Sequence, residues 1–329
     1  MNVVNRTGGK HLALPMKDRD GHMRLVVIVK YTYRATPRGA MERDDEGPAP
    51  RPVDIPNGDD LATSSIALPS DLFDYKPGTD VVLVGDAHPR PGAAYTDVTL
   101  RMGPIDKTVR AYGLRVWQRG IFGGLAPGPA MPLRAPLPLV YELAWGGADR
   151  SVPDKPLVEP RNEVGRGVTR EPAKLVNQPA AQLELAHKPL GERGNVPASF
   201  GAIHRHWQPR ASFGGTYDQA WTETRMPLLP TDFDARFYVC VPHDQWSPSP
   251  LFADEPIEVT GATEDGVWRV RLPRDAPSFS SIVEGVRRTH ATHLDTVLID
   301  ARARRVELNW RVSIPAPPKL ELIHEVRIT

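Results

Sequence analysis

Proline stands at 35 of the 329 positions of this chain, roughly twice its usual share of ~5%. A proline inside a helix removes a backbone hydrogen bond and clashes with the preceding turn, so this density argues against long helices. It suits short strands that are joined by turns and extended loops. We therefore predict a mainly β fold with one or two short helices.

Alternation of apolar and polar residues supports this prediction. In RVELNWRVSI, residues 305–314, every second residue is apolar. The pattern predicts a strand with one buried face and one face in water, as in antiparallel sheets. DTVLID, residues 295–300, precedes this strand closely enough to predict a hairpin. KLELIHEVRI, residues 319–328, alternates in the same way.

Helical signals are few, and the best is TYDQAWTETR, residues 216–225. Thr216 is its expected N-cap, and Pro227 ends it. Strands do not alternate with helices as they do in a βαβ fold. Many short strands at close spacing instead favour a large antiparallel β-sandwich or a barrel-like architecture.

Long proline-rich loops are expected at residues 37–60, 122–138 and 146–174. The third is the natural place to divide the chain, although both sides of it are rich in strand signals. The chain is either one domain over residues 1–329 or two packed β subdomains divided near 146–174.

Charge and cysteine content restrict the partners and the compartment. The formal net charge is +1, so bulk electrostatics favours neither nucleic acid nor an anionic membrane as a partner. Cys240 is the single cysteine, so no intramolecular disulfide forms, and a reducing compartment is favoured. The N-terminal residues show no apolar stretch of signal-peptide length. We expect a cytoplasmic protein that does not bind membranes.

The segment FGAIHRHWQPR, residues 200–210, is the densest group of reactive side chains. On a strand, His204 and His206 would share one face, because alternate residues point the same way. Zinc needs three or four ligands, and no spacing compels His187 or Asp218 to complete the set.

The interpretation that we favour for this segment is a turn. In it, His206 and Trp207 pack against the protein, while Arg205 and Arg210 pair with carboxylates. A metal site at His204 and His206 remains the weaker alternative.

Other possible catalytic features are weaker still. HATH, residues 290–293, lacks the glutamate of a hydrolytic HExxH zinc site, so a solvated turn is preferred. Cys240 lies in the apolar RFYVCV and is interpreted as a small buried residue rather than a nucleophile. There is no G-x-S-x-G nucleophile elbow and no Walker A loop. We predict no catalytic residue and no cofactor.

Seven tryptophans are spread along the chain. Trp268 and Trp310 lie in alternating patterns and are predicted to be core residues. Trp145, Trp207 and Trp221 adjoin segments rich in glycine and arginine, where a tryptophan either fills the core or anchors an interface. For these three we favour the core.

Several motifs in sequence order resemble one bacterial family. SDLFDYKPGTD, residues 70–80, fits S-D-x-x-x-x-K-P-x-T-D, and YELAWGG, residues 141–147, fits Y-E-x-A-x-G-G. RHWQPR, residues 205–210, fits R-H-W-x-P-R. It belongs to the most specific piece, FGAIHRHWQPR (residues 200–210) with GTYDQAWTETRMPLLPTDFDARFY (residues 215–238). Together the motifs run nearly end to end. They resemble a domain-of-unknown-function family whose genes lie beside spike and toxin genes of type VI secretion systems.

The resemblance implies an effector adaptor or chaperone. Such a protein binds a toxin effector in the cytoplasm and helps to load it onto the spike protein. No catalytic residues are established for the family, so none are carried over. The candidate partner-binding residues are Trp145, Arg205, His206, Trp207, Arg210 and Trp221.

Two other functions stay open on the residues alone. One is a metal-dependent hydrolase that uses His204 and His206. The other is a carbohydrate-binding β-sandwich that uses exposed tryptophans.

Overall fold

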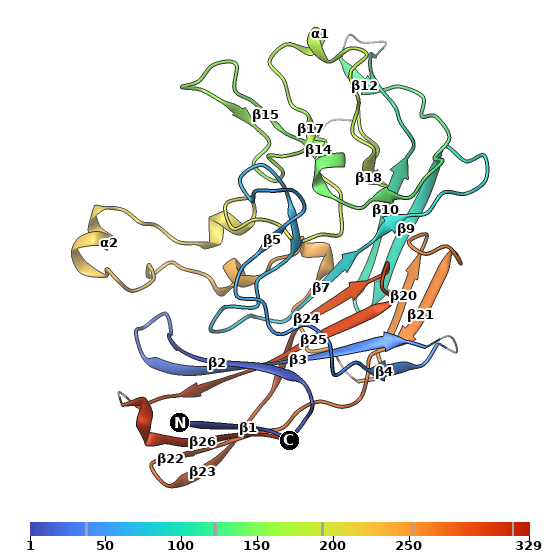
Figure 1. Cartoon of the computed structure of the whole chain (residues 1–329). Coiled ribbons are helices and arrows are strands. Elements are labelled where there is room, and N and C mark those ends of the chain that lie inside the picture. Colours follow the sequence, from blue (N-terminus) through green and yellow to red (C-terminus); the bar gives the residue numbers. More distant parts are fainter. Residues whose placement is uncertain (37–38, 121–123, 192–193, 252, 318) are drawn as a thin grey trace.

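The computed structural model describes residues 1–36, 39–120, 124–191, 194–251, 253–317 and 319–329. Strands make up 40% of it and helices 8%, which confirms the prediction of a mainly β fold. Figure 1 shows three larger sheets, with an irregular region of short ladders and loops beside them. Each of these sheets has two free ends in its strand order and is open rather than closed on itself.

The central sheet has seven strands in the order β19-β7-β24-β25-β3-β2, with β4 paired to β3. The strands are β2 (Lys10–Lys17), β3 (Met23–Ala35), β4 (Met41–Arg43), β7 (Thr79–Val84), β19 (Trp246–Ser247), β24 (His293–Asp300) and β25 (Arg305–Pro315). The predicted hairpin is present, because β24 and β25 pair in antiparallel fashion. Strands β7 and β24 are parallel, although they are far apart in the sequence.

Two smaller sheets flank the central one (Figure 1). The five-stranded sheet contains β18 (Leu183–Leu185), β10 (Ile105–Tyr112), β9 (Tyr95–Met102), β20 (Pro256–Thr260) and β21 (Val267–Arg271), in that order. The four-stranded sheet contains β1 (Asn2–Asn5), β26 (Ile323–Ile328), β22 (Phe279–Val283) and β23 (Val286–His290). Most pairings are antiparallel as predicted, but β1 and β26 are parallel.

The predicted loops contain short ladders, because their residues still find backbone partners. Within or beside the loops lie β5 (Ile55–Pro56), β6 (Ile66–Leu68), β8 (Asp86–Ala87), β11 (Trp117–Arg119), β12 (Leu125–Pro127), β13 (Leu137–Pro138), β14 (Trp145–Gly146), β15 (Ala148–Asp149), β16 (Leu157–Val158) and β17 (Arg166–Gly167). Residues 37–38 and 122–123 of two of the predicted loops lie outside the described residues.

The helices are short, as predicted. They are α1 (Pro172–Leu175) and α2 (Gln219–Thr224), with single 3-10 turns at η1 (Tyr141–Leu143), η2 (Arg210–Phe213), η3 (Ala235–Tyr238), η4 (His243–Gln245) and η5 (Leu320–Leu322). No helix in the described part of the chain is long and apolar enough to cross a membrane.

The predicted N-cap of α2 was wrong by two residues. Asp218, not Thr216, is the N-cap, and its carboxylate accepts a hydrogen bond from the Trp221 amide at 2.8 Å. The Thr216 hydroxyl instead donates to Asp232 at 2.7 Å, so it is not free to cap a helix.

The C-terminal alternation was only partly correct. Leu320 and Leu322 lie in η5, and β26 begins at Ile323, which is buried. His324 is exposed, although the pattern placed it with the apolar residues. The pairing register shifts between Ile282 and Val283 opposite this start, which changes the phase of the strand.

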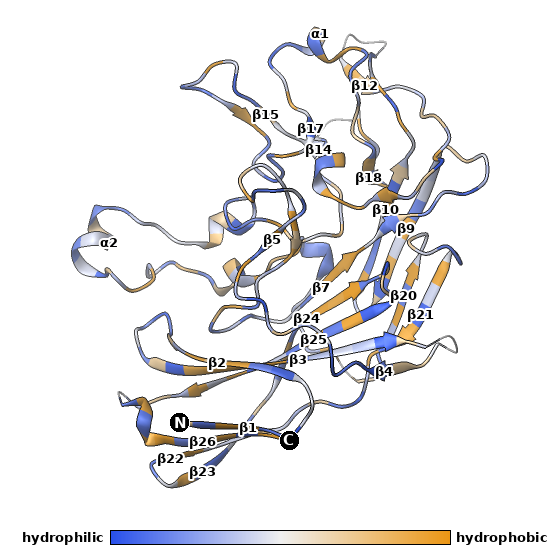
Figure 2. Cartoon of the chain, in the orientation of Figure 1, coloured by the Kyte–Doolittle hydropathy of each residue, from blue (hydrophilic) through white to orange (hydrophobic). Residues whose placement is uncertain are grey.

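One hydrophobic cluster joins the three sheets. It includes Val29 of β3, Leu100 of β9 and Ile328 of β26, all fully buried. Residues on both sides of segment 146–174 contribute to this cluster. In Figure 2 hydrophobic stretches recur along the strands of the central sheet, with hydrophilic residues between them. The division of the chain into one or two domains stays a prediction.

The polar face of β25 is the largest departure from expectation. The sequence pattern placed Glu307, Asn309 and Arg311 in water, yet each of them is only 2% exposed. The central sheet is therefore buried on both faces.

Candidate functional site

Segment 70–80, the first of the family-like motifs, lies across the polar face of the central sheet. Asp71 is its anchor. Its carboxylate accepts from Lys30 of β3 at 2.6 Å and from Asn309 of β25 at 2.5 Å. Arg311 of β25 donates to the backbone carbonyl of Asp71 at 2.8 Å. The motif thus covers β3 and β25 through charged hydrogen bonds rather than apolar contacts.

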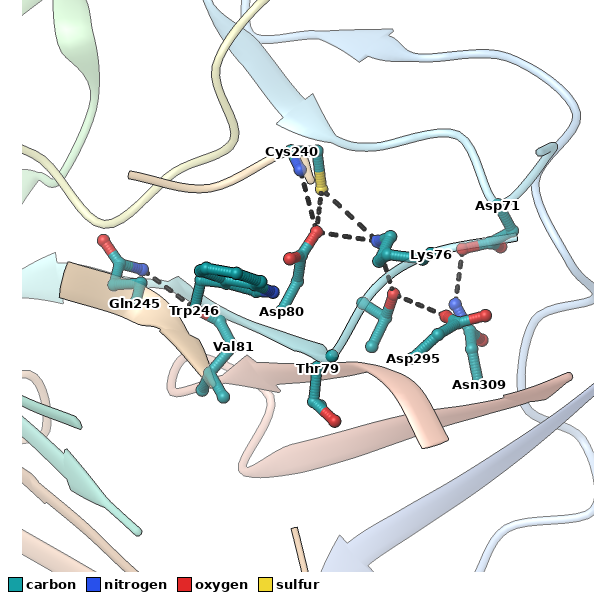
Figure 3. A network of polar contacts seen from close by, with 12 residues as sticks. Asp71, Lys76, Thr79, Asp80, Val81, Cys240, Gln245, Trp246, Asp295 and Asn309 are labelled. Atoms are coloured by element: carbon teal, nitrogen blue, oxygen red, sulfur yellow. Dashed lines mark hydrogen bonds and ion pairs between the residues drawn. The ribbon is translucent and has the colours of Figure 1, made fainter. Parts of the chain in front are cut away.

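A second cluster lies at the other end of the motif (Figure 3). The ammonium group of Lys76 contacts the Asp80 carboxylate at 2.7 Å and the Thr296 hydroxyl at 3.0 Å. The same Asp80 oxygen accepts from the backbone amide of Cys240 at 2.8 Å and from its thiol at 3.0 Å. Thr296 donates to Asp295, which pairs with Arg311 and connects this cluster to the first.

The charges in this network balance. Four cations and four carboxylates are buried in it, namely Lys30, Arg51, Lys76, Arg311, Asp71, Asp80, Asp295 and Glu307. A buried charge is tolerated when a partner of opposite sign and further hydrogen bonds compensate its lost hydration. The network therefore fixes segment 70–80 on the sheet through paired charges.

The pKa directions agree with this pairing. Burial would raise the pKa of Asp71, but Lys30 and Arg51 hold it below its ordinary value. Burial would lower the pKa of Lys76, but Asp80 raises it above the ordinary value. Burial raises the pKa of the Cys240 thiol, which makes it a poor nucleophile. The prediction that Cys240 is buried is confirmed, although its thiol also donates to Asp80.

Cys240 connects this network to segment 200–210. Its backbone carbonyl accepts from the Ile203 amide at 2.8 Å. The Ile203 carbonyl in turn accepts from the Arg210 guanidinium at 2.7 Å, and the same guanidinium donates to the Phe237 carbonyl at 2.7 Å. Arg210 thereby closes segment 203–210 into a loop against residues 237–240.

The two histidines lie in a turn rather than on a strand, so the strand premise of the metal hypothesis was wrong. Their rings are 4.9 Å apart between centroids. His204 is buried, and its Nε2 atom is 2.9 Å from the Ser64 carbonyl, whereas His206 is exposed. Nowhere in the described ranges do three or more His, Cys, Asp or Glu residues form a group that could hold a metal.

The expected pairing of the arginines was wrong for Arg210. It is buried and bonds to two backbone carbonyls instead of a carboxylate. The nearby Asp80 carboxylate is already used by Lys76 and Cys240. Arg205 is exposed on the turn, and no ion pair of it is seen within the described residues.

The candidate tryptophans do not gather in one place. Trp207 is 1% exposed and packs edge-on against Tyr141 at 5.5 Å, so it belongs to the core. Trp145 on β14 is partly buried and meets Trp117 edge-on at 5.9 Å. Trp221 lies on α2, where it is also only partly buried. Of the two tryptophans predicted from alternation, Trp268 is 4% exposed and Trp310 packs partly buried against the core.

Two adjoining hollows lie beside segment 203–210, and we call them together the motif groove. The smaller, of about 150 Å³, has Arg210 in its wall together with apolar side chains. The larger, of about 390 Å³, shares Ile203, Pro209 and His243 with it. The groove can receive an extended chain or a small molecule, because its walls combine apolar surface with a few polar groups.

A second candidate surface is the projecting hairpin that carries α2, residues 214–231, which we call the arm (Figure 1). Tyr217 and Met226 are 56% and 60% exposed there. The Tyr217 ring contacts Trp221 edge-on at 4.8 Å. Arg19 in the β2–β3 turn donates to the Thr231 carbonyl at 3.0 Å and helps to hold the base of the arm. The arm therefore presents apolar surface on an anchored support.

Sequence reasoning missed Asp71, Lys76 and Asp80 as the residues that order this region. A signal was available, because Asp80 is the second residue of the buried strand β7 and Lys76 precedes this strand closely. Charged residues next to an apolar run need buried partners. The partners lie on β3, β24 and β25, however, and no local pattern identifies them.

Comparison with known families gives one match. A family model described as an uncharacterized protein conserved in bacteria, DUF2169, matches residues 20–311. No curated protein and no solved structure matches the chain. The matched range includes the network, segment 200–210 and the arm. Since the match spans most of its length, the chain belongs to the DUF2169 family.

Proposed function

We propose that this protein is an effector adaptor or chaperone of a type VI secretion system. It binds a cognate toxin effector in the cytoplasm and helps to load that effector onto the spike protein. The proposal rests on the motif resemblance and on one structural observation, the apolar surface of the arm. It requires no catalytic residue and no cofactor.

The arm supports a binding role for a physical reason. Tyr217, Trp221 and Met226 place two aromatic rings and a thioether on one short projection. Aromatic residues and methionine are enriched at protein interfaces, and exposed apolar patches often mark them. Binding to the folded effector stabilises it by mass action, which is how an adaptor also acts as a chaperone.

The two alternative functions receive less support. A hydrolase at His204 and His206 lacks a third ligand among the described residues, and His204 is occupied by the Ser64 carbonyl. A carbohydrate site at Trp207 conflicts with its 1% exposure, because sugar-stacking rings must be accessible. Neither alternative has an observation in its favour.

The test is a pull-down from the native cytoplasm with mass spectrometry of the partners. We expect a toxin effector and a spike protein to be recovered, and we expect effector level and spike association to fall when the gene is deleted. If effector level, solubility and spike association are all unchanged by the deletion, the proposal is wrong.

The contribution of the arm is tested with a double variant, Tyr217→Ser with Met226→Ser. It should reduce effector recovery and leave the thermal unfolding of the protein unchanged, because both side chains are exposed. Leu114→Ser with Val286→Ser is the matched control, since these residues are 50% and 52% exposed elsewhere on the surface. Equal losses in the two double variants would assign no role to the arm.

A further inference from the structure

We propose that the smaller hollow of the motif groove binds the C-terminal residue of a partner polypeptide. Arg210 would take the terminal carboxylate, and the apolar walls would take the last side chain. The inference deepens the proposed binding role by naming the chemistry of one contact. The inference rests on the proposed function in one respect, namely that the ligand is a polypeptide.

Arg210 differs from the other buried cations of the protein. The described residues include seven buried lysines and arginines, namely Lys30, Arg51, Lys76, Lys107, Arg115, Arg210 and Arg311. Six of them contact a carboxylate oxygen at 2.5 to 3.0 Å. Among the described residues no carboxylate lies within ion-pair distance of Arg210. Its direct hydrogen-bond partners are two backbone carbonyls, and the Asp54 and Asp80 carboxylates act on it only from a longer distance.

A buried guanidinium without a counter-charge is costly, because carbonyl dipoles replace only part of its hydration. An anion in the hollow would supply the missing charge. A carboxylate suits the site, because the planar guanidinium forms short, charge-assisted hydrogen bonds with it. The Nε and one terminal nitrogen of Arg210 are engaged by Phe237 and Ile203. The other terminal nitrogen forms no hydrogen bond within the described part of the chain.

The rest of the wall selects an apolar group. It includes Ile203, Phe213, Val239, Val241 and Trp246. The volume of about 150 Å³ is similar to that of an apolar cavity that holds one benzene molecule. One aromatic or branched side chain therefore fits.

A chain terminus combines the two groups that the hollow recognises. Its last residue carries a carboxylate and a side chain on one α-carbon, and capture of a C-terminal carboxylate is a known mode of peptide recognition. The larger hollow shares three wall residues with the smaller one and provides room for the preceding residues. Arg236 at the rim is already paired with Asp234 at 2.6 Å, so Arg210 is the cation that remains to bind the terminus.

Another hollow, of about 790 Å³ between β4 and β21, lacks this feature. Four arginines line it too, and three of them are paired with carboxylates of its walls. The fourth, Arg271, is exposed and donates to the backbone carbonyl of Asp254. Arg43 contacts Asp275 at 3.1 Å, and Arg269 contacts Glu258 at 2.6 Å. The contrast makes the hollow at Arg210 the stronger candidate for an anionic ligand.

The experiment measures the binding of two fluorescent peptides to the full-length protein. Both have the sequence Gly-Gly-Ser-Phe, one with a free C-terminus and the other with a C-terminal amide. The free acid should bind saturably and at least about tenfold more tightly than the amide, because only the acid forms a charge-assisted pair. The acid of Gly-Gly-Ser-Gly should bind at least about tenfold more weakly, because it leaves the apolar wall empty.

Three variants locate the site. Arg210→Gln should weaken binding of the free acid at least about tenfold, and Val239→Phe should abolish it by filling the hollow while Arg210 stays in place. Arg287→Gln is the control, because it removes an exposed arginine of β23, in a different part of the fold, and should change the affinity less than about twofold. If Arg210→Gln fails to fold, Val239→Phe still tests the location.

Several outcomes would overturn the proposal. They are equal binding of acid and amide, equal binding of the phenylalanine and glycine termini, no saturable binding of the free acid, and unchanged binding by Val239→Phe. Peptide binding without recovery of an effector from the cytoplasm would count against the secretion role alone. A different result would count against this inference alone. In it, Val239→Phe leaves effector recovery unchanged, and the protein binds the free-acid and the amide peptide equally.

Discussion

The Asp80 carboxylate accepts two hydrogen bonds from Cys240, from its backbone amide at 2.8 Å and from its thiol at 3.0 Å. These residues are 160 positions apart. Through Cys240 and Ile203 the contact continues to the Arg210 loop, so an acidic residue at the start of β7 helps to shape the wall of the motif groove. A continuous chain of hydrogen bonds therefore connects the buried network to the candidate binding site.

Asp80→Asn should destabilise the protein by about 3–5 kcal/mol, because it leaves the Lys76 ammonium buried without its counter-charge. Urea unfolding gives the change in the free energy of unfolding. Asp106→Asn is the control, since it removes a carboxylate that pairs with Arg101 at the surface, and it should cost little. Similar losses of unfolding free energy in both variants would show that the buried ion pair stabilises the protein no more than the surface pair does.

His204→Ala should cost about 1–3 kcal/mol, because it removes a buried ring and leaves the Ser64 carbonyl without that partner. His206→Ala should cost much less, since its side chain is exposed. Neither variant should change the metal content of the purified protein. A stoichiometric zinc that disappears in either variant would restore the hydrolase alternative.

Stability should fall as the pH drops below about 6.5. Burial lowers the pKa of His204 below its ordinary value of 6.5, so the unfolded chain takes up a proton at a pH where the folded protein does not. One such group changes the free energy of unfolding by at most about 1.4 kcal/mol per pH unit. Urea unfolding between pH 8 and 5.5 should show a flatter profile for His204→Gln. The profile should not become flat, because burial also lowers the pKa of His290.

The Cys240 thiol should resist alkylation in the native protein. It is buried, donates to Asp80 and has a raised pKa because of its burial, so little thiolate forms. Mass spectrometry after iodoacetamide treatment should find no adduct until the chain is unfolded in urea. Rapid, complete modification of the folded protein would contradict this environment.

Asp218→Ala should loosen the arm without unfolding the protein. The loss of an N-cap costs about 0.5–2 kcal/mol of helix stability, which corresponds to about 2- to 30-fold faster amide exchange in α2 if opening is local. Hydrogen exchange of residues 219–224 measures this, and the overall melting temperature should stay nearly the same. A large drop in melting temperature would mean that the arm is part of the cooperative core.

The resemblance identified two of the segments that build the candidate site, but not what their residues contact. RHWQPR was expected to pair its arginines with carboxylates, yet Arg210 bonds to carbonyls of residues 203 and 237, which lie on separate segments. SDLFDYKPGTD was noticed only as a motif, because the partners of Asp71 and Lys76 lie on strands far away in the sequence. A single sequence without an alignment contains no signal for such long-range pairs.

Period and composition alone determined that this chain is mainly β, that its helices are short and that residues 295–314 form a hairpin, because proline content and alternation act locally. Only the tertiary structure decided that the polar face of β25 is buried. Alternation reports a difference between two faces, and it cannot tell water from a covering segment that carries matching charges. Asp71 and Lys76 supply such charges, and that covering layer places Arg210 beside an apolar hollow with no carboxylate of its own.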